Sequence, residues 1–426
     1  MGDHRRYKMF SSDGDMEQGT ELQRMEVMRR QLESLFGEVF GKASGRFFVS
    51  STPLRLAPLG AHSDHQGGCV TGMAINRFIH LFGTAIEERV LHIYSDGFGD
   101  AEAIAFDDIA QGAQSDWRNY IRGSIAVAEQ AWGQLHSGFR GVLQGRMPIG
   151  GLSSSAAVIL SYLSALAYAN KIKVSVDDYI ELVRRVENEY LGLKNGTMDQ
   201  SIITQAERDC LTWINCGTKE KRSIPQPRET SPWELMVVYS GLSRQLTATP
   251  FNSRVAECRQ AALEMSALLG RQELLLGQFS VEEFESVENR LSVIARKRAR
   301  HYFSEFVRVQ TGVEMWRSGK VAEFGTLISE SGNSSIVNFE SGSPELIALY
   351  EMLSQMTGVL GTRFCGGGFQ GCCFAMVQAG YRDVLREMLH KHYRDGYRDL
   401  VDKYSVHFCE SVDGFTSEEV ECVIAP

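Results

Sequence analysis

The apolar residues of the chain follow a strand pattern in some segments and a helix pattern in others. Runs rich in β-branched and aromatic residues, separated by glycine loops, occupy residues 46–93 and predict strands. Apolar positions recur at helical spacing over 117–135, 155–169 and 177–191, and helical patterns also dominate 255–329. Strand-like runs such as ELMVVYS and GCCFAMV follow without strict alternation, which predicts an α+β architecture with mixed sheets.

Length and local composition suggest how the chain divides. A chain of 426 residues is too long for one ordinary core, so two domains are expected. The polar segment 219–233 contains three prolines and is the predicted boundary. We therefore predict an N-terminal domain over 21–225 and a C-terminal domain over 226–426. Residues 1–20 lack an apolar run, which favours a disordered tail over a signal peptide.

Overall composition narrows the class of protein. A hydrophobic content of 43% and a charged content of 23% are typical of a soluble globular protein. The net charge of −9 argues against binding nucleic acid, and the most apolar stretch, from Ala156, is too short to cross a membrane. Nine scattered cysteines without a C-x-x-C pair suit reduced thiols, so we expect a cytoplasmic protein.

The segment PIGGLSSSAAV, residues 148–158, is the most informative loop. Gly150 and Gly151 allow a tight turn and close approach to a ligand, and Ser153, Ser154 and Ser155 then open an apolar helix. A helix start attracts anions, and serine hydroxyls donate to phosphate or ligate Mg²⁺. The simpler alternative is N-capping, but one cap needs only one serine. The segment therefore predicts a phosphate loop, although it is not a Walker A sequence.

The segment PLGAHSDHQGG, residues 58–68, places His62, Asp64 and His65 in one loop. These side chains suit a metal, a turn cap or a polar substrate. A zinc site is disfavoured because no further cluster of ligands accompanies them. A second glycine-rich run, 366–371, formally matches a dinucleotide fingerprint but precedes a strand-like run instead of a helix.

Four segments, taken together, resemble the motifs of the GHMP kinase superfamily. PLRLAPLGAHSDHQGG is similar to the first motif of galactokinases, PIGGLSSSAA to the second, VENEYLGLKNGTMDQ to the A-E-H-x-F-x-G-x-x-x-G-x-M-D-Q segment, and GGGFQGCC to the third motif. The resemblance covers nearly the whole chain. Within the family, the opening loop looks most like that of plant galacturonokinases. The resemblance implies a two-domain GHMP kinase fold, with the active site between the domains.

The resemblance also implies roles for particular residues. Asp199, placed by its sequence in a turn between a helix and a strand, matches the catalytic aspartate, and Arg55 matches its partner. Glu187 lies on the inward stripe of the helix that begins at Asp177. The family pattern pairs it with Mg²⁺, shared with Ser154 or a neighbouring serine of the glycine-serine loop. The positions implied for ATP are Gly150, Gly151, Leu152, Ser153, Ser154, Ser155, Gly367 and Gly368.

The opening loop departs from galactokinases at one position that bears on specificity. Galactokinases carry there a glutamate that reaches the sugar 6-hydroxyl, and this chain has Ala61. A glutamate would repel a carboxylate at carbon 6 by about 4 kcal/mol at 4 Å. We therefore expect D-galacturonate as the substrate, phosphorylated at its anomeric oxygen by ATP, with galactose or L-arabinose as alternatives.

The remaining expectations concern the other sugar contacts and the alternatives to catalysis. Phe251 replaces a family tyrosine. His62 or His65 could supply hydrogen bonds or a positive charge to a uronate, and Arg244 is a second candidate counter-charge. A non-catalytic, galactokinase-like sensor is a rival, disfavoured by the intact Arg55, Glu187 and Asp199. We expect a monomer or weak homo-oligomer. The positions expected to contact sugar are Ala61, His62, Asp64, His65, Gly196, Arg244 and Phe251.

Overall fold

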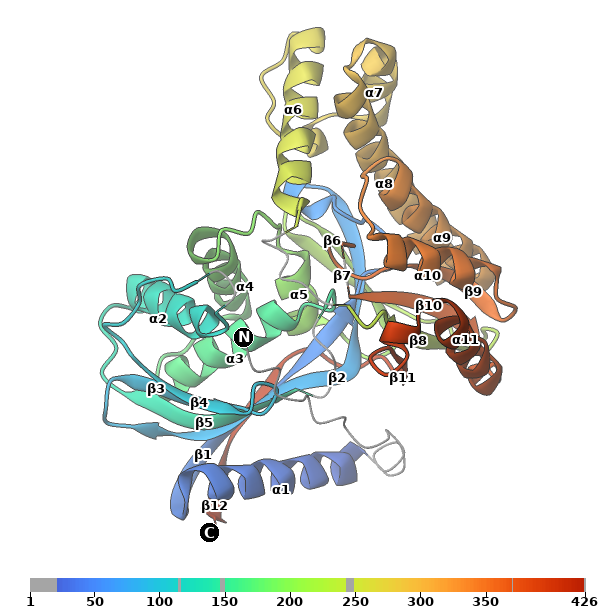
Figure 1. Cartoon of the computed structure of the whole chain (residues 1–426). Coiled ribbons are helices and arrows are strands. Elements are labelled where there is room, and N and C mark those ends of the chain that lie inside the picture. Colours follow the sequence, from blue (N-terminus) through green and yellow to red (C-terminus); the bar gives the residue numbers. More distant parts are fainter. Residues whose placement is uncertain (1–20, 114–115, 146–149, 243–248, 370, 425–426) are drawn as a thin grey trace.

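The protein folds around two β-sheets in a computed structural model that describes residues 21–113, 116–145, 150–242, 249–369 and 371–424 (Figure 1). The larger sheet has the order β12-β1-β2-β5-β3-β4, and β6 and β7 extend it from β2. All of its pairs are antiparallel except the parallel pair β3–β5. Its strands are β1 (Ala43–Leu56), β2 (Cys69–Ile86), β3 (Val90–Ser95), β4 (Asp100–Ala105), β5 (Gly138–Gly145), β6 (Cys210–Asn215), β7 (Glu220–Pro225) and β12 (Thr416–Ile424).

The smaller sheet belongs to the second half of the chain and is entirely antiparallel. Its order is β11-β8-β10-β9, with the buried strand β10 paired to both β8 and β9. The strands are β8 (Trp233–Tyr239), β9 (Val359–Phe364), β10 (Cys372–Gln378) and β11 (Ser405–Cys409). The predicted α+β class with mixed and antiparallel sheets is confirmed.

Helices cover the two sheets and form a projection above them. The apolar α3 is almost wholly buried, while α6, α7 and the start of α8 project from the body (Figure 1). Helices of the first half are α1 (Glu21–Phe40), α2 (Arg118–Trp132), α3 (Ser154–Ala169), α4 (Val176–Arg185) and α5 (Met198–Gln205). Those of the second half are α6 (Phe251–Leu269), α7 (Val281–Val287), α8 (Val293–Arg317), α9 (Val321–Val337), α10 (Pro344–Gln355) and α11 (Arg382–Gly396).

The helix predicted over 177–191 is two segments. Ser175 caps α4, because its Oγ accepts a hydrogen bond from the backbone N–H of Asp178 at 3.1 Å. The α-helix ends at Arg185, and one π-helical turn, Val186–Tyr190, follows. Such a turn inserts a residue into the helical repeat and is frequent at functional sites. It carries Glu187.

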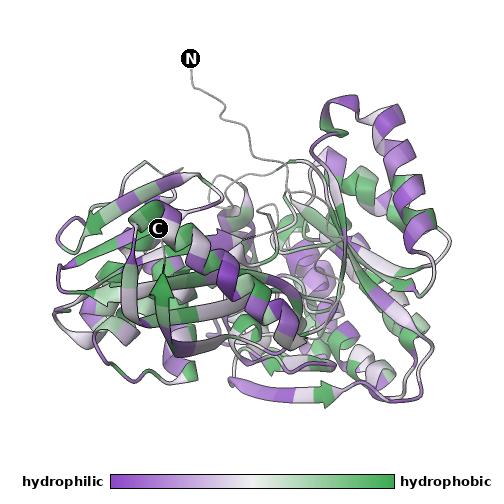
Figure 2. Ribbon diagram, turned by 90° about the horizontal axis from the view of Figure 1, so that it is seen from below, coloured by the Kyte–Doolittle hydropathy of each residue, from purple (hydrophilic) through white to green (hydrophobic). Residues whose placement is uncertain are grey.

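The helix α1 lies across the larger sheet and mixes hydrophilic with hydrophobic residues along its length (Figure 2). Its residues Met28, Leu32 and Phe36 are buried against Phe47 and Phe82 of β1 and β2. Their spacing of four places them on one face of the helix. The sequence prediction did not assign a helix here, although the spacing was present.

The C-terminal strand does not follow the predicted division of the chain at 225/226. β12 pairs along β1, from Thr416 opposite Ser51 to Ile424 opposite Ala43, so residues 416–424 complete the sheet of the first half. A long-range strand pairing of this kind leaves no local signal in composition. The rest of the division remains a prediction.

Candidate active site

The glycine-serine loop leads directly into α3. Ser153 precedes the helix with a left-handed backbone (φ 65°) and makes no capping hydrogen bond with its side chain. Its Oγ is buried and has no hydrogen-bond partner among the described residues. A buried hydroxyl without a partner is costly, so the simple N-capping alternative does not account for it. It is an available donor beside the start of a helix.

The third glycine-rich run packs against this loop, backbone against backbone. A Cβ on Gly150 would lie 2.8 Å from the Cα of Gly371, and one on Gly151 would lie 2.7 Å from the carbonyl oxygen of Cys365. Only glycine permits this approach. Gly368, next to Gly367 in the turn between β9 and β10, has a φ of 73°. The strand β10 follows residues 366–371, as the sequence predicted, whereas a dinucleotide fingerprint would require a helix there.

Arg55 joins the glycine-serine loop to Asp199. Its Nε and Nη2 donate to Asp199 Oδ1 at 2.9 and 2.7 Å, and its Nη1 donates to the carbonyl of Gly151 at 2.8 Å. The backbone N–H of Arg55 donates to the carbonyl of Leu152 at 3.2 Å. The guanidinium is buried, while the Asp199 side chain is 21% exposed. A buried cation thus holds a partly accessible carboxylate beside the loop.

Asp199 does not lie in a turn between a helix and a strand, as the sequence suggested. It occupies the first turn of α5, which begins at Met198 after Thr197. The first turn of a helix stabilises a negative charge through its unpaired N–H groups and dipole. A helix of only eight residues, directly after a glycine-containing loop, was too short for its periodicity to be recognised.

Glu187 is the second residue of the π-helical turn. Its side chain is buried, as its position on the apolar stripe predicted. Its Oε1 accepts a hydrogen bond from Ser155 Oγ at 2.7 Å, and its Oε2 accepts from Asn195 Nδ2 at 2.9 Å and Gln200 Nε2 at 2.5 Å. Ser155, the neighbour of Ser154, is the serine that contacts Glu187. Burial, with the nearby charge of Asp199, raises the Glu187 pKa to about 7.

Asp64 lies against the loop that leads to α5. Its Oδ2 accepts a hydrogen bond from the Gly196 backbone N–H at 3.1 Å. A Cβ on Gly196 would come within 2.6 Å of that oxygen, so glycine is required there. Burial and the nearby Asp199 carboxylate raise the Asp64 pKa to about 6. Asp64 and Asp199 therefore belong to one electrostatic site.

The two histidines of the opening loop are buried beside aromatic rings. The His62 ring stacks on Phe339 at a centroid distance of 3.9 Å, and both His62 and His65 lie near Phe251, at 6.3 and 6.1 Å. Neither Nε2 has a hydrogen-bond partner among the described residues. Among the same residues, no group of three or more His, Cys, Asp or Glu side chains is arranged to hold a metal.

Burial keeps these imidazoles neutral. It lowers the His62 pKa well below its usual value and the His65 pKa to about 3, and nearby cationic groups add to both effects. Neutral rings can donate or accept hydrogen bonds to a sugar. Of the two roles expected for His62 and His65, the lowered pKa values favour hydrogen bonding over a positive charge.

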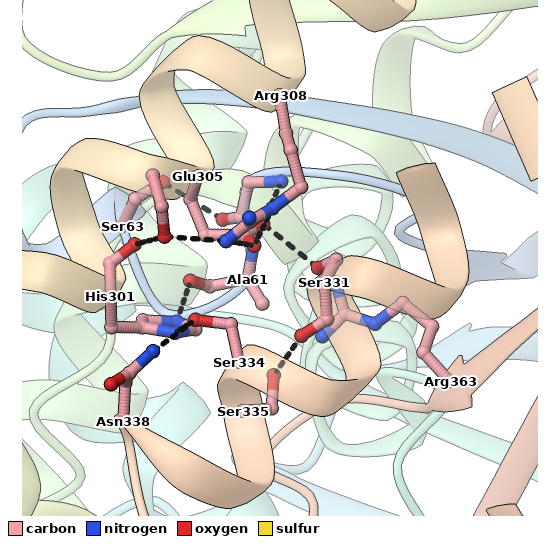
Figure 3. A network of polar contacts seen from close by, with 12 residues as sticks. Ala61, Ser63, His301, Glu305, Arg308, Ser331, Ser334, Ser335, Asn338 and Arg363 are labelled. Atoms are coloured by element: carbon pink, nitrogen blue, oxygen red, sulfur yellow. Dashed lines mark hydrogen bonds and ion pairs between the residues drawn. The ribbon is translucent and has the colours of Figure 1, made fainter. Parts of the chain in front are cut away.

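Ala61 is held by its backbone from the second half of the chain. Its N–H donates to Glu305 Oε2 at 3.0 Å, and its carbonyl lies 2.9 Å from His301 Nε2, both on α8 (Figure 3). Sequence reasoning missed these contacts because 240 or more residues separate the partners. It also missed Asn195 and Gln200, although both lie within the quoted VENEYLGLKNGTMDQ segment. Arg244 falls outside the described residues.

Comparison with known protein families agrees with this arrangement. The galactokinase galactose-binding signature matches residues 34–85, the GHMP kinase N-terminal domain matches 119–207, and the GHMP kinase C-terminal domain matches 314–395. These matches cover the opening loop, the glycine-serine loop and the helices α9 and α10, whereas His301 and Glu305 of α8 lie outside them. The chain belongs to the GHMP kinase family and is an ATP-dependent sugar kinase.

Within this family, the chain is similar to sugar kinases over most of its length. It is 36% identical to the galacturonokinase of Arabidopsis thaliana over 407 residues, which is 90% of this chain and 96% of that protein. It is 31% identical to the galactokinase of Exiguobacterium sibiricum, covering 82% of this chain and 88% of that protein.

Solved structures show the same fold. The structure of Lactococcus lactis galactokinase complexed with galactose matches with a TM-score of 0.83 at 27% identity, over 92% of this chain and 99% of that chain. A mevalonate kinase structure matches with a TM-score of 0.58 at 14% identity, which shows the fold alone. No helix within the described ranges combines the length and apolarity that crossing a membrane would need.

Proposed function

We propose that the protein transfers the γ-phosphoryl group of ATP to the anomeric hydroxyl of D-galacturonate, giving galacturonate 1-phosphate and ADP. The observation that carries this proposal is Ala61, at the position where the galactokinase pattern has a glutamate. An alanine there removes the repulsion that a carboxylate at carbon 6 would meet, which is about 4 kcal/mol for charges about 4 Å apart. The similarity to a plant galacturonokinase supports the same substrate.

The opening loop would hold the sugar. Asp64 offers a carboxylate to the ring hydroxyls, and Gly196 fixes its orientation through the 3.1 Å hydrogen bond. The buried Nε2 atoms of His62 and His65 lack partners in the described structure, so they are available to the sugar. Phe251 packs beside both rings and would form the apolar side of the sugar pocket. Satisfying buried polar atoms strengthens binding and orients the substrate.

Asp199 would act as the base for transfer. The anomeric hydroxyl passes its proton to the Asp199 carboxylate while its oxygen bonds to the γ-phosphorus, and the bond from that phosphorus to the bridging oxygen of ADP breaks. Arg55 holds Asp199 in place and supports the negative charge that develops on the phosphoryl oxygens. Its contact with the Gly151 carbonyl ties this pair to the phosphate loop.

The loop from Gly150 to Ser155 would cradle the phosphates, with the free hydroxyl of Ser153 directed to them. Ser155 or Ser154, together with Glu187, offers the oxygen donors that Mg²⁺ prefers. When bound, Mg²⁺ neutralises phosphate charge. Glu187 has a raised pKa of about 7, which fits a carboxylate awaiting a cation, because a bound cation would favour its charged form.

A substrate panel tests the proposal. We expect kcat/KM for D-galacturonate to exceed that for D-galactose and L-arabinose, measured by ADP release with ATP and Mg²⁺. In the variant Ala61→Glu, turnover of galacturonate should fall more than turnover of galactose. A wild-type preference for galactose would refute the assignment, and uronate binding without ADP release would indicate a sensor instead of an enzyme.

A further inference from the structure

The backbone of the opening loop rests on a buried carboxylate. Glu305 Oε2 accepts hydrogen bonds from the N–H groups of Gly60 and Ala61 at 2.8 and 3.0 Å, and from Ser331 Oγ at 2.9 Å (Figure 3). Glu305 is fully buried. A carboxylate taken out of water must be offset by cations and hydrogen bonds.

Two arginines surround this carboxylate, so the cluster carries more positive than negative charge. Arg308 donates to Glu305 Oε1 at 2.8 Å. Arg363, on β9, is 2% exposed. Its hydrogen bonds among the described residues go to neutral groups, namely Ser331 Oγ at 2.9 Å and the carbonyls of Phe364 and Pro58 at 3.2 and 3.4 Å. The negative charge of Glu305 thus offsets the positive charge of Arg308, and the positive charge of Arg363 is left without a balancing carboxylate in this cluster.

His301 does not change this balance. It bridges Ser334 Oγ and the Ala61 carbonyl, both at 2.9 Å, and its pKa is lowered by burial to about 4, so the ring is neutral. The excess charge lies next to the sugar pocket, because Arg363 reaches Pro58 at the start of the opening loop. It is also among the charges that keep His62 neutral.

We propose that Arg363 is a specificity-determining residue, whose buried charge attracts the carboxylate of an acidic sugar from behind the Ala61–His62 loop. This inference rests on the proposed function. A glutamate at position 61 would place a negative charge near this cluster. With alanine at that position, the carboxylate of the substrate can provide the negative charge instead. Arg363 acts through its electric field, which is weakly screened in the buried interior, and needs no contact with the sugar.

The test compares two substitutions that remove charges of opposite sign, Arg363→Gln and the isosteric Glu305→Gln. Arg363→Gln should lower the ratio of kcat/KM for galacturonate to kcat/KM for galactose by about tenfold or more, because the substitution removes a weakly screened positive charge. Glu305→Gln should raise the same ratio. Taking the ratio cancels changes in loop position that affect both sugars equally. Arg363→Lys keeps the charge and should restore most of the wild-type ratio.

A matched control separates the effect of the lost charge on substrate preference from the loss of stability that follows removal of any buried arginine. Arg298, fully buried on α8, pairs with Glu257 and Glu340, so its charge is already balanced. Arg298→Gln should lower the melting temperature but leave the substrate ratio unchanged. If Arg363→Gln does not fold, Glu305→Gln alone decides, because an unchanged or lowered ratio overturns the inference.

The inference and the proposed function fail in different ways. If the wild-type enzyme prefers galactose, the proposed function is wrong. If the wild-type enzyme prefers galacturonate and both charge deletions leave that preference intact, only the role of Arg363 is wrong. Ratios that move in opposite directions support it.

Discussion

Replacing Glu187 with glutamine should stabilise the metal-free protein while lowering its activity. Glu187 is 1% exposed, and its pKa of about 7 lies well above the 4.5 of a free glutamate. Glutamine has the same shape and no charge. Its oxygen can accept from Asn195 and Gln200, and its amide can donate to the Ser155 hydroxyl once that group rotates. The substitution therefore keeps the hydrogen bonds and removes a buried charge.

The size and sign of the effect follow from the pKa. A raised pKa means that the wild-type protein loses stability as pH rises from about 4.5 to about 7, because the folded state resists ionisation of Glu187. The shift corresponds to about 3 kcal/mol above pH 7. For a chain of this length, that is a change in melting temperature of about 3 °C. The variant should match the wild type near pH 4.5 and exceed it above pH 7.

The assay is a set of melting curves between pH 4.5 and 8.5, with metal removed by chelation. Glu189→Gln is the matched control, because Glu189 is exposed and pairs with Arg185 at 3.2 Å. The Glu189→Gln variant should show no gain in melting temperature over the wild type. A Glu187→Gln variant that melts lower than the wild type at pH 8, or whose difference from it does not vary with pH, would refute the reasoning. Added Mg²⁺ should stabilise the wild type more than this variant.

Two further predictions concern the sugar side of the site. Asp199→Asn should lower kcat by about 10²–10⁴ with little change in KM for ATP, because it removes the base but leaves the glycine-serine loop intact. Steady-state kinetics measure both quantities, and an undiminished kcat would exclude Asp199 as the base. Gly196→Ala should raise KM for the sugar and leave KM for ATP unchanged, since the new methyl would lie 2.6 Å from Asp64 Oδ2. If both KM values rise equally, the effect is a general loss of structure, and Asp64 is not the cause.

Local sequence patterns were sufficient to predict the helices whose apolar residues recur at a clear helical spacing. The apolar run from Ala156 predicted α3, and the stripe shared with Val183 predicted that Glu187 faces inward, because helical periodicity alone determines which residues share a face. Residue types alone predicted that the Gly150–Ser155 segment binds phosphate. The helix α1 was missed although Met28, Leu32 and Phe36 repeat every four residues.

Only the tertiary structure decided how distant residues meet and which of them carry charge. Arg55 and Asp199 are 144 residues apart, and Ala61 and Glu305 are 244 apart, so no local periodicity connects them. The neutrality of His62 likewise depends on burial by residues such as Phe339. A sequence fixes local conformation through short-range sterics and periodicity, whereas burial, and therefore the charge state of a site, arises only when the whole chain packs.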